Sequence, residues 1–340
     1  MPLTRRMFTQ ALASTLLLYH LPSFAQPVKF WASPMHPDAK KITRIVSAGA
    51  PADLLLLAVA PEKLVGFSSF DFAREAAIPL PLAIRHLPKL GRLAGRASSL
   101  SMEGLMALQP DLVVDCGNTD DTWISQARQV SEQTQIPWLL LNGKLEQSAE
   151  QLTTLGKTLG EENRAAEQAS LANRFVREAQ VFAASPAANI RFYAARGARG
   201  LETGLQGSLH TEAAELLGLH NVAQIADRHG LAQVSMENLL RWQPDIILVQ
   251  DPVTADFIRN DTLWQGVKAV AERRILFLTG LPFGWLDAPP GINRLLGLRR
   301  LHAWLDPVVN SQFKNDMQRY AQLFWHCTLS DADYQKMVAS

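Results

Sequence analysis

The sequence has little cysteine, no histidine-rich tract and no excess of charge of either sign. Its two cysteines, Cys116 and Cys327, lie far apart and outside any C-x-x-C spacing, which argues against an iron–sulfur cluster or a structural zinc site. Cys116 follows a strand-like apolar run, so we expect two separate buried thiols, although an exported protein would allow them to pair. Lys and Arg number 33 against 32 acids, so no basic surface for nucleic acid is expected.

The motifs of common enzymes on two-lobed α/β folds are missing as well. No G-x-G-x-x-G follows a strand, and G-x-x-x-x-G-K-[ST], G-x-S-x-G and H-E-x-x-H do not occur. The histidines are scattered, and a bare zinc or manganese ion needs three or four convergent ligands. His210, before an expected helix at 211–217, is interpreted as a residue of the helix N-terminus in preference to a metal ligand. We expect no catalytic residue, no cofactor and no directly bound metal.

The first 25 residues differ from the rest of the chain. Arg5 and Arg6 precede an acid-free apolar run from Ala11 to Leu21, and a small-x-small pattern ends at Ala25. This pattern resembles a twin-arginine export signal. The alternative is a membrane anchor, but the run is shorter than the roughly 20 residues that span a bilayer. No cysteine lies near the cleavage region for lipid attachment, so we expect a free periplasmic protein.

Apolar strand signals alternate with helical segments in the remaining chain. Strand-like runs occur at 43–47, 64–67, 112–114 and 138–141, and helical patterns occur between them. Because strands that alternate with helices form parallel sheets covered on both faces, the sequence predicts an α/β fold.

An internal repeat divides this α/β pattern into two parts. Ser101-Met102-Glu103 and Gln109-Pro110-Asp111 recur 134 residues later as Ser235-Met236-Glu237 and Gln243-Pro244-Asp245. Each copy is followed by an apolar strand signal. Two copies at this spacing predict two lobes of the same architecture, whereas a solenoid would need at least three copies at a shorter period.

The segment between the copies is expected to be helical. Residues 145–184 are rich in Ala, Glu, Gln, Leu and Arg and contain no proline. Residues 161–184 would extend roughly 36 Å as a helix, enough to join two domains as a stiff rod. In chain order we expect a signal peptide at 1–25, an N-terminal lobe at 26–147, a connecting helix at 148–185, a C-terminal lobe at 186–310 and C-terminal helices at 311–340.

Two glutamates at equivalent positions of the repeat support a resemblance to a known family. Glu103 and Glu237 each lie two residues after a serine that can cap a helix, and a helix-dipole contribution of about 0.3–1 kcal/mol would explain either glutamate but not the pair. With Leu64-Val65-Gly66, Pro110-Asp111 and Pro244-Asp245 in this order, the chain resembles periplasmic binding proteins for iron–siderophore, haem and cobalamin complexes. In that family one surface glutamate of each lobe meets arginines of a membrane permease.

The resemblance implies most of the expected function. It implies two Rossmann-like lobes with parallel sheets, joined by a single long α-helix, with the ligand in the cleft between them and little closure on binding. It implies that Glu103 and Glu237 dock on the permease dimer of an ABC importer in the inner membrane. It also implies a monomer whose cargo is a metal complex, such as a ferric chelate of the siderophore type.

Candidate ligand-binding residues are those on loops at the carboxyl ends of strands, where open α/β sheets bind ligands. Arginines there can pair with carboxylate or catecholate oxygens of an anionic chelate, or they are solvated loop residues. Two aromatic residues near position 284 either pack beneath their loop or present a flat wall to a planar ligand. The candidates are Ser69, Arg92, Asn118, Arg196, Arg199, Phe283 and Trp285.

Other functions stay open on the sequence alone. An oxyanion receptor for molybdate or tungstate would have the same fold and would use backbone amides, hydroxyls and arginine at helix N-termini such as that near Ser208. A haem or cobalamin receptor would also share the fold. A two-lobed enzyme is the rival class, because fold does not determine function, and the missing motifs count against it.

Overall fold

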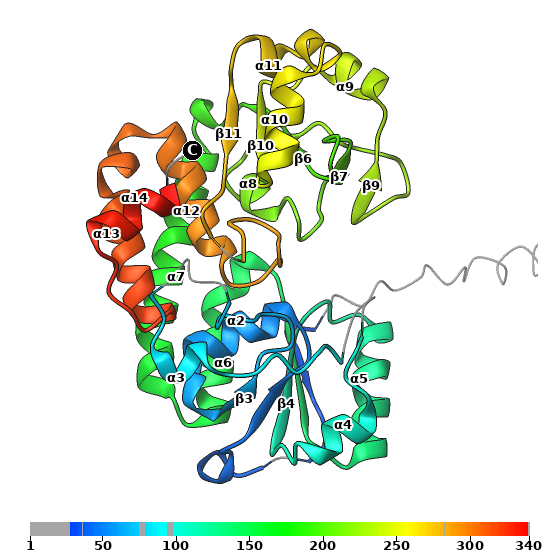
Figure 1. The fold of residues 1–340 in the computed structure, drawn as a ribbon, viewed down its shortest axis with the longest axis vertical. Helices are drawn as coiled ribbons and strands as arrows, with labels where there is room; N and C mark the ends of the chain where they lie inside the picture. The colour runs from blue at the N-terminus through cyan, green and yellow to red at the C-terminus, as the bar shows by residue number, and fades with distance from the viewer. Residues whose placement is uncertain (1–27, 36, 75–78, 94–97, 282, 339–340) are drawn as a thin grey trace, which may run out of the picture.

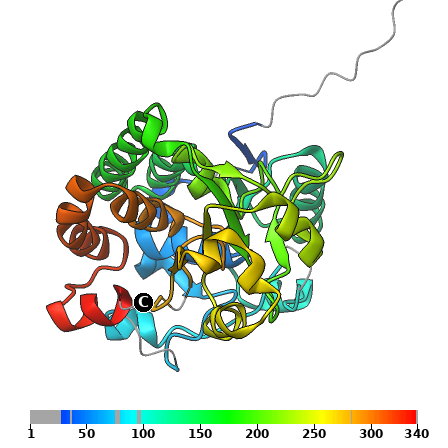
Figure 2. The same ribbon diagram turned by 90° about the horizontal axis from the view of Figure 1, so that it is seen from above.

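The computed structural model describes residues 28–35, 37–74, 79–93, 98–281 and 283–338. The expected signal peptide at 1–25 lies outside these described residues. Figure 1 shows two lobes one above the other, with a group of helices along one side of both. Figure 2, turned by 90°, shows the C-terminal helices on that same side. The predicted α/β class with two parallel-sheet lobes is confirmed.

The N-terminal lobe is built on a five-stranded sheet in the order β1-β5-β4-β2-β3. β1 pairs antiparallel at the edge, and the other four strands are parallel. All residues of β2 and β5 are buried, as continuous apolar runs predict for parallel strands covered on both faces. The elements are β1 (Phe30–Ala32), β2 (Ile45–Ser47), α2 (Ala50–Val59), β3 (Leu64–Gly66), α3 (Leu82–Arg85), α4 (Met102–Ala107), β4 (Leu112–Gly117), α5 (Asp121–Thr134) and β5 (Trp138–Asn142).

The C-terminal lobe contains a parallel sheet in the order β11-β10-β6-β8 and a separate antiparallel pair, β7 and β9. Ile246 to Val249, which the sequence marks as the strand of the second copy, form the fully buried β10. The elements are β6 (Arg191–Ala195), β7 (Glu202–Gly204), α8 (Glu212–Leu216), β8 (His220–Asn221), β9 (Leu231–Gln233), α9 (Met236–Trp242), β10 (Ile246–Val249), α10 (Pro252–Asn260), α11 (Lys268–Ala271) and β11 (Ile275–Phe277).

Two helices occupy the segment expected as the connecting helix. α6 (Ser148–Leu159) ends at Gly160, whose φ of +73° is in the left-handed region that glycine adopts without steric penalty. The 22-residue α7 (Glu162–Ala183) then runs to the second lobe. α12 (Arg294–Leu305) and α13 (Pro307–Phe324) pack against α7, and α14 (Asp331–Val338) packs on α13. The expected division between residues 310 and 311 falls inside α13.

No helix in the described part of the chain combines the length and the apolar composition that crossing a membrane requires.

The sequence repeat is also a repeat of structure. Asp111 accepts a hydrogen bond from the amide of Arg44, and Asp245 accepts one from the amide of Arg191, both at 2.9 Å. The glutamine two positions before each aspartate has a φ of 46°, and its carbonyl accepts a bond from the side chain of the same arginine. Each lobe therefore joins its repeated helix to its central strands in the same way.

A buried cluster of charges joins α7, α12 and α13. The side chain of Arg299 on α12 is only 1% exposed and lies 2.6 Å from Asp316 of α13 and 2.5 Å from Glu178 of α7. Arg174 of α7 adds a second bond to Asp316, at 2.5 Å. Because a buried charge without a partner is strongly destabilising, these bonds hold the C-terminal helices against α7.

Replacing Arg299 tests this attachment. We expect Arg299→Ala to lower the free energy of unfolding by about 3–5 kcal/mol, because Asp316 keeps a buried charge that, among the described residues, only Arg174 then compensates. Urea denaturation measures the loss. Arg319→Ala is the matched control, since Arg319 also joins α13 to α7, through Glu167, but the two side chains are 50% and 61% exposed. The control should lose about 1 kcal/mol or less, and equal losses would contradict the prediction.

Candidate functional site

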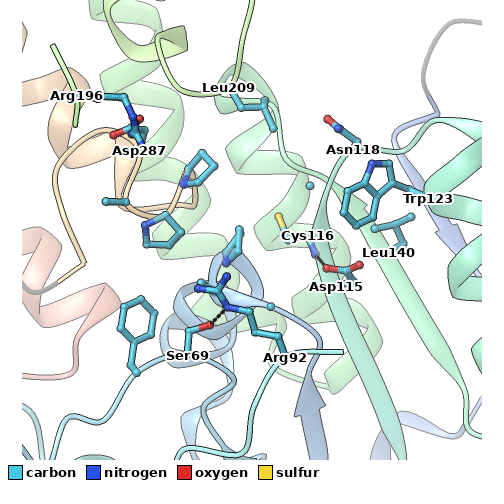
Figure 3. A pocket seen from close by; sticks show the side chains of 18 residues that line it. Ser69, Arg92, Asp115, Cys116, Asn118, Trp123, Leu140, Arg196, Leu209 and Asp287 are labelled. Atoms are coloured by element: carbon cyan, nitrogen blue, oxygen red, sulfur yellow. Dashed lines mark hydrogen bonds and ion pairs between the residues drawn. The ribbon is translucent and has the colours of Figure 1, made fainter. Parts of the chain in front are cut away.

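A cavity of about 630 Å³ lies between the two lobes. Figure 3 shows side chains from both lobes around it. As the rule for open α/β sheets predicts, the residues from the N-terminal lobe follow or end parallel strands. The walls include Pro51, Ser69, Arg92 and Asp115 from this lobe and Leu209 and Asp287 from the C-terminal part of the chain.

The first turn of α2 forms part of the cavity wall. Gly49, Ala50 and Pro51 line the cavity, and Gly49 caps the helix without a side-chain hydrogen bond. Helix N-termini carry a partial positive charge, so this end of α2 favours an anionic group in the cavity.

Asp53 in the same helix positions the loop of Ser68 and Ser69, which adjoins the cavity. Its carboxylate accepts hydrogen bonds from the amides of Ser68 and Ser69, at 2.7 and 3.0 Å, and from the Ser68 hydroxyl at 2.8 Å. Burial raises the pKa of Asp53 to about 6 despite these bonds. The Ser69 side chain is thereby held at the cavity wall.

Arg92 provides a positive charge that the described residues leave uncompensated. Its Nε donates a hydrogen bond to Ser69 Oγ at 2.8 Å, which Figure 3 shows as a dashed line. Within the described part of the chain, no carboxylate lies at ion-pair distance from its guanidinium. Arg92 is therefore able to form charge-assisted hydrogen bonds to an anionic ligand.

Arg196 occupies the opposite wall and is already paired. Its guanidinium lies 3.2 Å from Glu202 and also pairs with Asp287, which is buried. His210 Nδ1 lies 3.1 Å from the same Asp287 carboxylate. Burial, followed by the charge of Arg196, lowers the pKa of His210 to about 4, so the imidazole is neutral at physiological pH.

Asp115 lies near the end of β4 and faces the cavity, and few polar groups offset its charge. The residue is 6% exposed, and Oδ1 accepts the Cys116 amide at 2.8 Å. The other carboxylate oxygen has no hydrogen bond from any described residue. Figure 3 shows Asp115 below the ring of Trp123 and next to Leu140. Burial raises the pKa of Asp115 to about 6.

A second cavity of about 340 Å³ adjoins the first. It shares the lining residues Asn118 and Leu209 with the main cavity, and Lys144, His210 and His229 add polar groups to its walls. The main cavity alone offers room for a ligand larger than a single small ion.

Four of the seven predicted binding residues line the main cavity: Ser69, Arg92, Asn118 and Arg196. They come from four separate segments of the chain, three in the N-terminal lobe and one in the C-terminal lobe. Their contact with a ligand stays a prediction.

Phe283 and Trp285 do not line the cavity, so their selection as binding residues was wrong. Both side chains are 0% exposed. The Trp285 Nε1 donates to the Thr279 carbonyl at 2.6 Å, and the Phe283 ring packs edge-to-face against Phe70 and Trp325. Of the two interpretations of these aromatic residues, packing beneath the loop is the one observed, because this arrangement removes their apolar surface from water.

Arg199 also lies outside the cavity lining. It is exposed, and its guanidinium lies 5.9 Å from the centre of the Phe257 ring of α10. The loop from Arg196 to Arg199 therefore supplies one cavity residue and one surface residue.

Several cavity residues were missed. Asp115 and Cys116 directly follow the predicted strand at 112–114, and the rule that ligands bind at carboxyl ends of strands would have included them. Asp287 lies two residues after Trp285, one of the predicted binding residues, on the same loop. No local pattern indicated Trp123 or Leu209.

Glu103 and Glu237 are exposed at the starts of α4 and α9. The hydroxyls of Ser101 and Ser235 cap these helices, accepting the amides of Gly104 at 3.1 Å and Asn238 at 3.2 Å. The Glu103 amide and the Ser101 hydroxyl lower the pKa of Glu103. Figure 1 shows α4 and α9 on the side of the molecule away from α7, one on each lobe.

The cysteines are separate thiols, Cys116 buried and Cys327 half-buried. Burial raises the pKa of both thiols to about 12, so neither is a reactive thiolate. The described residues contain no cluster of three or more His, Cys, Asp or Glu side chains arranged to hold a metal ion.

Known proteins share this sequence and this fold. A family model described as "periplasmic binding protein" matches residues 45–280. The molybdate-binding protein MolA of Haemophilus influenzae is 28% identical over 230 residues, which span 59% of this chain and 63% of MolA, less than two thirds of that relative.

Solved structures are similar over most of the chain. An ABC transporter solute binding protein from Sulfurospirillum deleyianum has a TM-score of 0.79 and 25% identity, covering 90% of this chain and 95% of that protein. MolA bound to molybdate has a TM-score of 0.68 and 22% identity, covering 87% and 96%. The vitamin B12 binding protein BtuF of Vibrio cholerae has a TM-score of 0.60 and 19% identity, covering 80% and 99%, and these last two likenesses support the fold alone.

The environment of Asp115 makes a prediction that needs no ligand. A folded-state pKa of about 6 against an ordinary value of 3.8 means that ionising Asp115 opposes folding, so stability is lost as pH rises from about 4 through about 6. We expect Asp115→Asn to raise the free energy of unfolding at pH ~7 by about 1–3 kcal/mol. Urea denaturation at both pH values is the measurement. A variant that is less stable at pH ~7, or a gain that persists unchanged at pH ~4, would contradict the prediction.

Proposed function

Because the chain belongs to the periplasmic binding protein family, we propose that it captures a metal chelate with anionic oxygen atoms, of the ferric siderophore type, and delivers it to an ABC importer. The main observation in favour of an anionic ligand is the position of Arg92. Its uncompensated charge lies at a wall of the cavity together with Ser69 and the first turn of α2. All three favour negatively charged oxygen atoms.

The size of the cleft favours a chelate over a small ion. A volume of about 630 Å³ lies within the range of about 300–1,000 Å³ of pockets that hold drug-sized molecules. A tetrahedral oxyanion would fill only a small part of it. Apolar walls at Trp123, Leu140 and Leu209 suit an organic ligand framework.

Molybdate or tungstate is the second candidate. The similarity to the molybdate-binding protein MolA favours it, and the α2 N-terminus, the Ser69 hydroxyl and Arg92 are groups that bind oxyanions. Haem and cobalamin complexes have no specific observation in their favour.

Mass spectrometry of the protein purified from its native periplasm separates these candidates. A co-purified organic chelator with iron would support the first, and bound molybdate or tungstate the second. Turnover of the bound molecule would indicate an enzyme and would contradict a role in binding alone.

We further propose that the protein is exported by its twin-arginine segment and acts in the periplasm as a monomer.

Replacing Arg92 tests the proposed contact. We expect Arg92→Gln to weaken binding of a ferric tris-catecholate complex whose catechol rings carry amide N–H groups about 10- to 100-fold, since a charge-assisted hydrogen bond contributes about 1.5–3 kcal/mol. Isothermal titration calorimetry measures the affinity. Arg199→Gln removes the same charge from an exposed position outside the cavity and should leave affinity within about twofold. If both variants bind like the unaltered protein, Arg92 does not hold the ligand.

Glu103 and Glu237 are proposed to dock on arginines of the permease. They are exposed residues at the starts of equivalent helices, and Figure 1 shows these two helices, one on each lobe, on the side of the molecule away from α7. A permease dimer would present one basic site to each lobe, so a matched pair of acids fits a partner with two similar halves.

Charge reversal at both positions tests the docking. We expect Glu103→Arg with Glu237→Arg to abolish uptake of the chelate by cells while affinity in solution stays within about twofold, because neither residue lines the cavity. Uptake of radiolabelled iron and calorimetry are the two measurements. The control reverses Glu132 and Glu272, exposed acids of the same two lobes. Normal uptake by the Glu103 and Glu237 variant would defeat the assignment.

A further inference from the structure

The two acidic residues in the cavity wall, Asp287 and Asp115, differ in how far neighbouring groups compensate their negative charges. Asp287 pairs with Arg196, lies beside His210 and accepts a hydrogen bond from Gln250. Asp115 has only the neighbouring Cys116 amide on one oxygen, and its second oxygen has no partner in the described part of the chain. Asp115 is thus a nearly buried acceptor that lines the cavity and is left for the ligand to satisfy.

A carboxylate oxygen that is open to the cavity and has no hydrogen bond from a described residue has consequences for the choice of ligand. A ligand oxygen that carries negative charge would be repelled by it, and the apolar surfaces of Trp123 and Leu140 reduce the screening of that repulsion. A ligand N–H, O–H or ammonium group would instead receive a strong charge-assisted hydrogen bond. The ring of Trp123 beside Asp115 would add a favourable surface for a cationic group.

We propose that Asp115 is a specificity-determining residue that accepts a hydrogen bond from a donor group of the ligand and discriminates against ligands that present only anionic oxygens, molybdate included. This inference rests on the proposed function in assuming that the cavity holds a solute. It adds that the chelate is polar at two ends, with anionic oxygens toward Arg92 and an amine, amide or hydroxyl toward Asp115.

The other charged groups around the cavity respond little to pH near neutrality. The guanidinium groups of Arg92 and Arg196 are the positive charges in the cavity wall. Burial lowers the pKa of His210 to about 4, so its imidazole is neutral near neutral pH. The pKa of the Cys116 thiol is about 12, so it is uncharged. Burial also raises the pKa of Asp53, which holds the loop of Ser68 and Ser69, to about 6. A pH effect on binding could therefore come from either carboxylate. Replacing Asp115 alone shows whether Asp115 is the cause.

Molybdate is the probe for the rejection of anions. With a pKa of about 6, Asp115 must take up a proton for an anion to bind beside it, which weakens binding about tenfold at pH ~7 and hardly at all at pH ~5. We expect calorimetry at pH ~7 to give at least about tenfold tighter binding of molybdate to Asp115→Asn than to the unaltered protein. The difference should disappear at pH ~5.

The control is Asp121→Asn, which removes the same charge from an exposed residue of α5 and should leave molybdate affinity within about twofold. If the asparagine variant fails to fold, Asp115→Ser removes the same charge and gives the same comparison. Equal or weaker binding of molybdate by the Asp115 variants overturns the proposal. Failure of every protein to bind molybdate overturns it too, because Asp115 is then not what excludes the ion.

A matched pair of chelates probes the selection of donors. The probes are the ferric complex of a linear trihydroxamate that ends in a primary amine and the same complex with the amine acetylated. We expect the unaltered protein to prefer the amine form at least about tenfold and Asp115→Asn to lose that preference. An equal preference in both proteins overturns the assignment. If neither chelate binds, the proposed function fails, while the molybdate comparison still decides the role of Asp115.

Discussion

The geometry of the cleft depends on one buried arginine between the lobes. Arg294, at the start of α12 and 2% exposed, donates to the carbonyls of Gly143 in one lobe and Leu209 in the other and lies 2.5 Å from Glu212. The Leu145 amide donates to the same Glu212 carboxylate at 3.0 Å. Separating the lobes would break several of these bonds at once and leave a buried charge without partners, which is strongly unfavourable. The cleft is therefore formed before a ligand enters it.

A fixed cleft means that its charges are arranged in advance, so the ligand must fit them and cannot rearrange them. Arg196 is held by two carboxylates, Glu202 and Asp287, so its charge is already compensated before a ligand arrives. Arg92 and Asp115 keep opposite charges without ionic partners in the described residues. Because preorganised polar groups bind without the free-energy cost of ordering them, these two side chains have the largest influence on which solute is held.

More of the fold than of the binding site could be predicted from the sequence. The buried parallel strands are recognisable in the sequence as continuous apolar runs. The internal repeat predicted that there are two lobes and that Glu103 and Glu237 are at equivalent positions. Side-chain direction on loops depends on contacts that the sequence does not contain: Phe283 is covered by Phe70 and Trp325 from distant segments. Arg196 and Arg199 diverge because Gly197, with a φ of +71°, turns the chain between them.

The two copies of the repeat have diverged at the ends of their strands and not at the starts of their helices. At the end of β4, Asp115 faces the cavity. At the matching end of β10, the position equivalent to Asp115 is the buried Val249. The next residue, Gln250, accepts the amides of Trp285 and Leu286 at 3.0 and 2.8 Å and donates to Asp287, so it orders the opposite wall. A partner with two similar halves, as proposed for the permease, constrains the outer helices to stay alike. A solute with two different ends, as proposed above, requires unlike strand ends, so the repeat points to the proposed docking residues and not to the proposed binding residues.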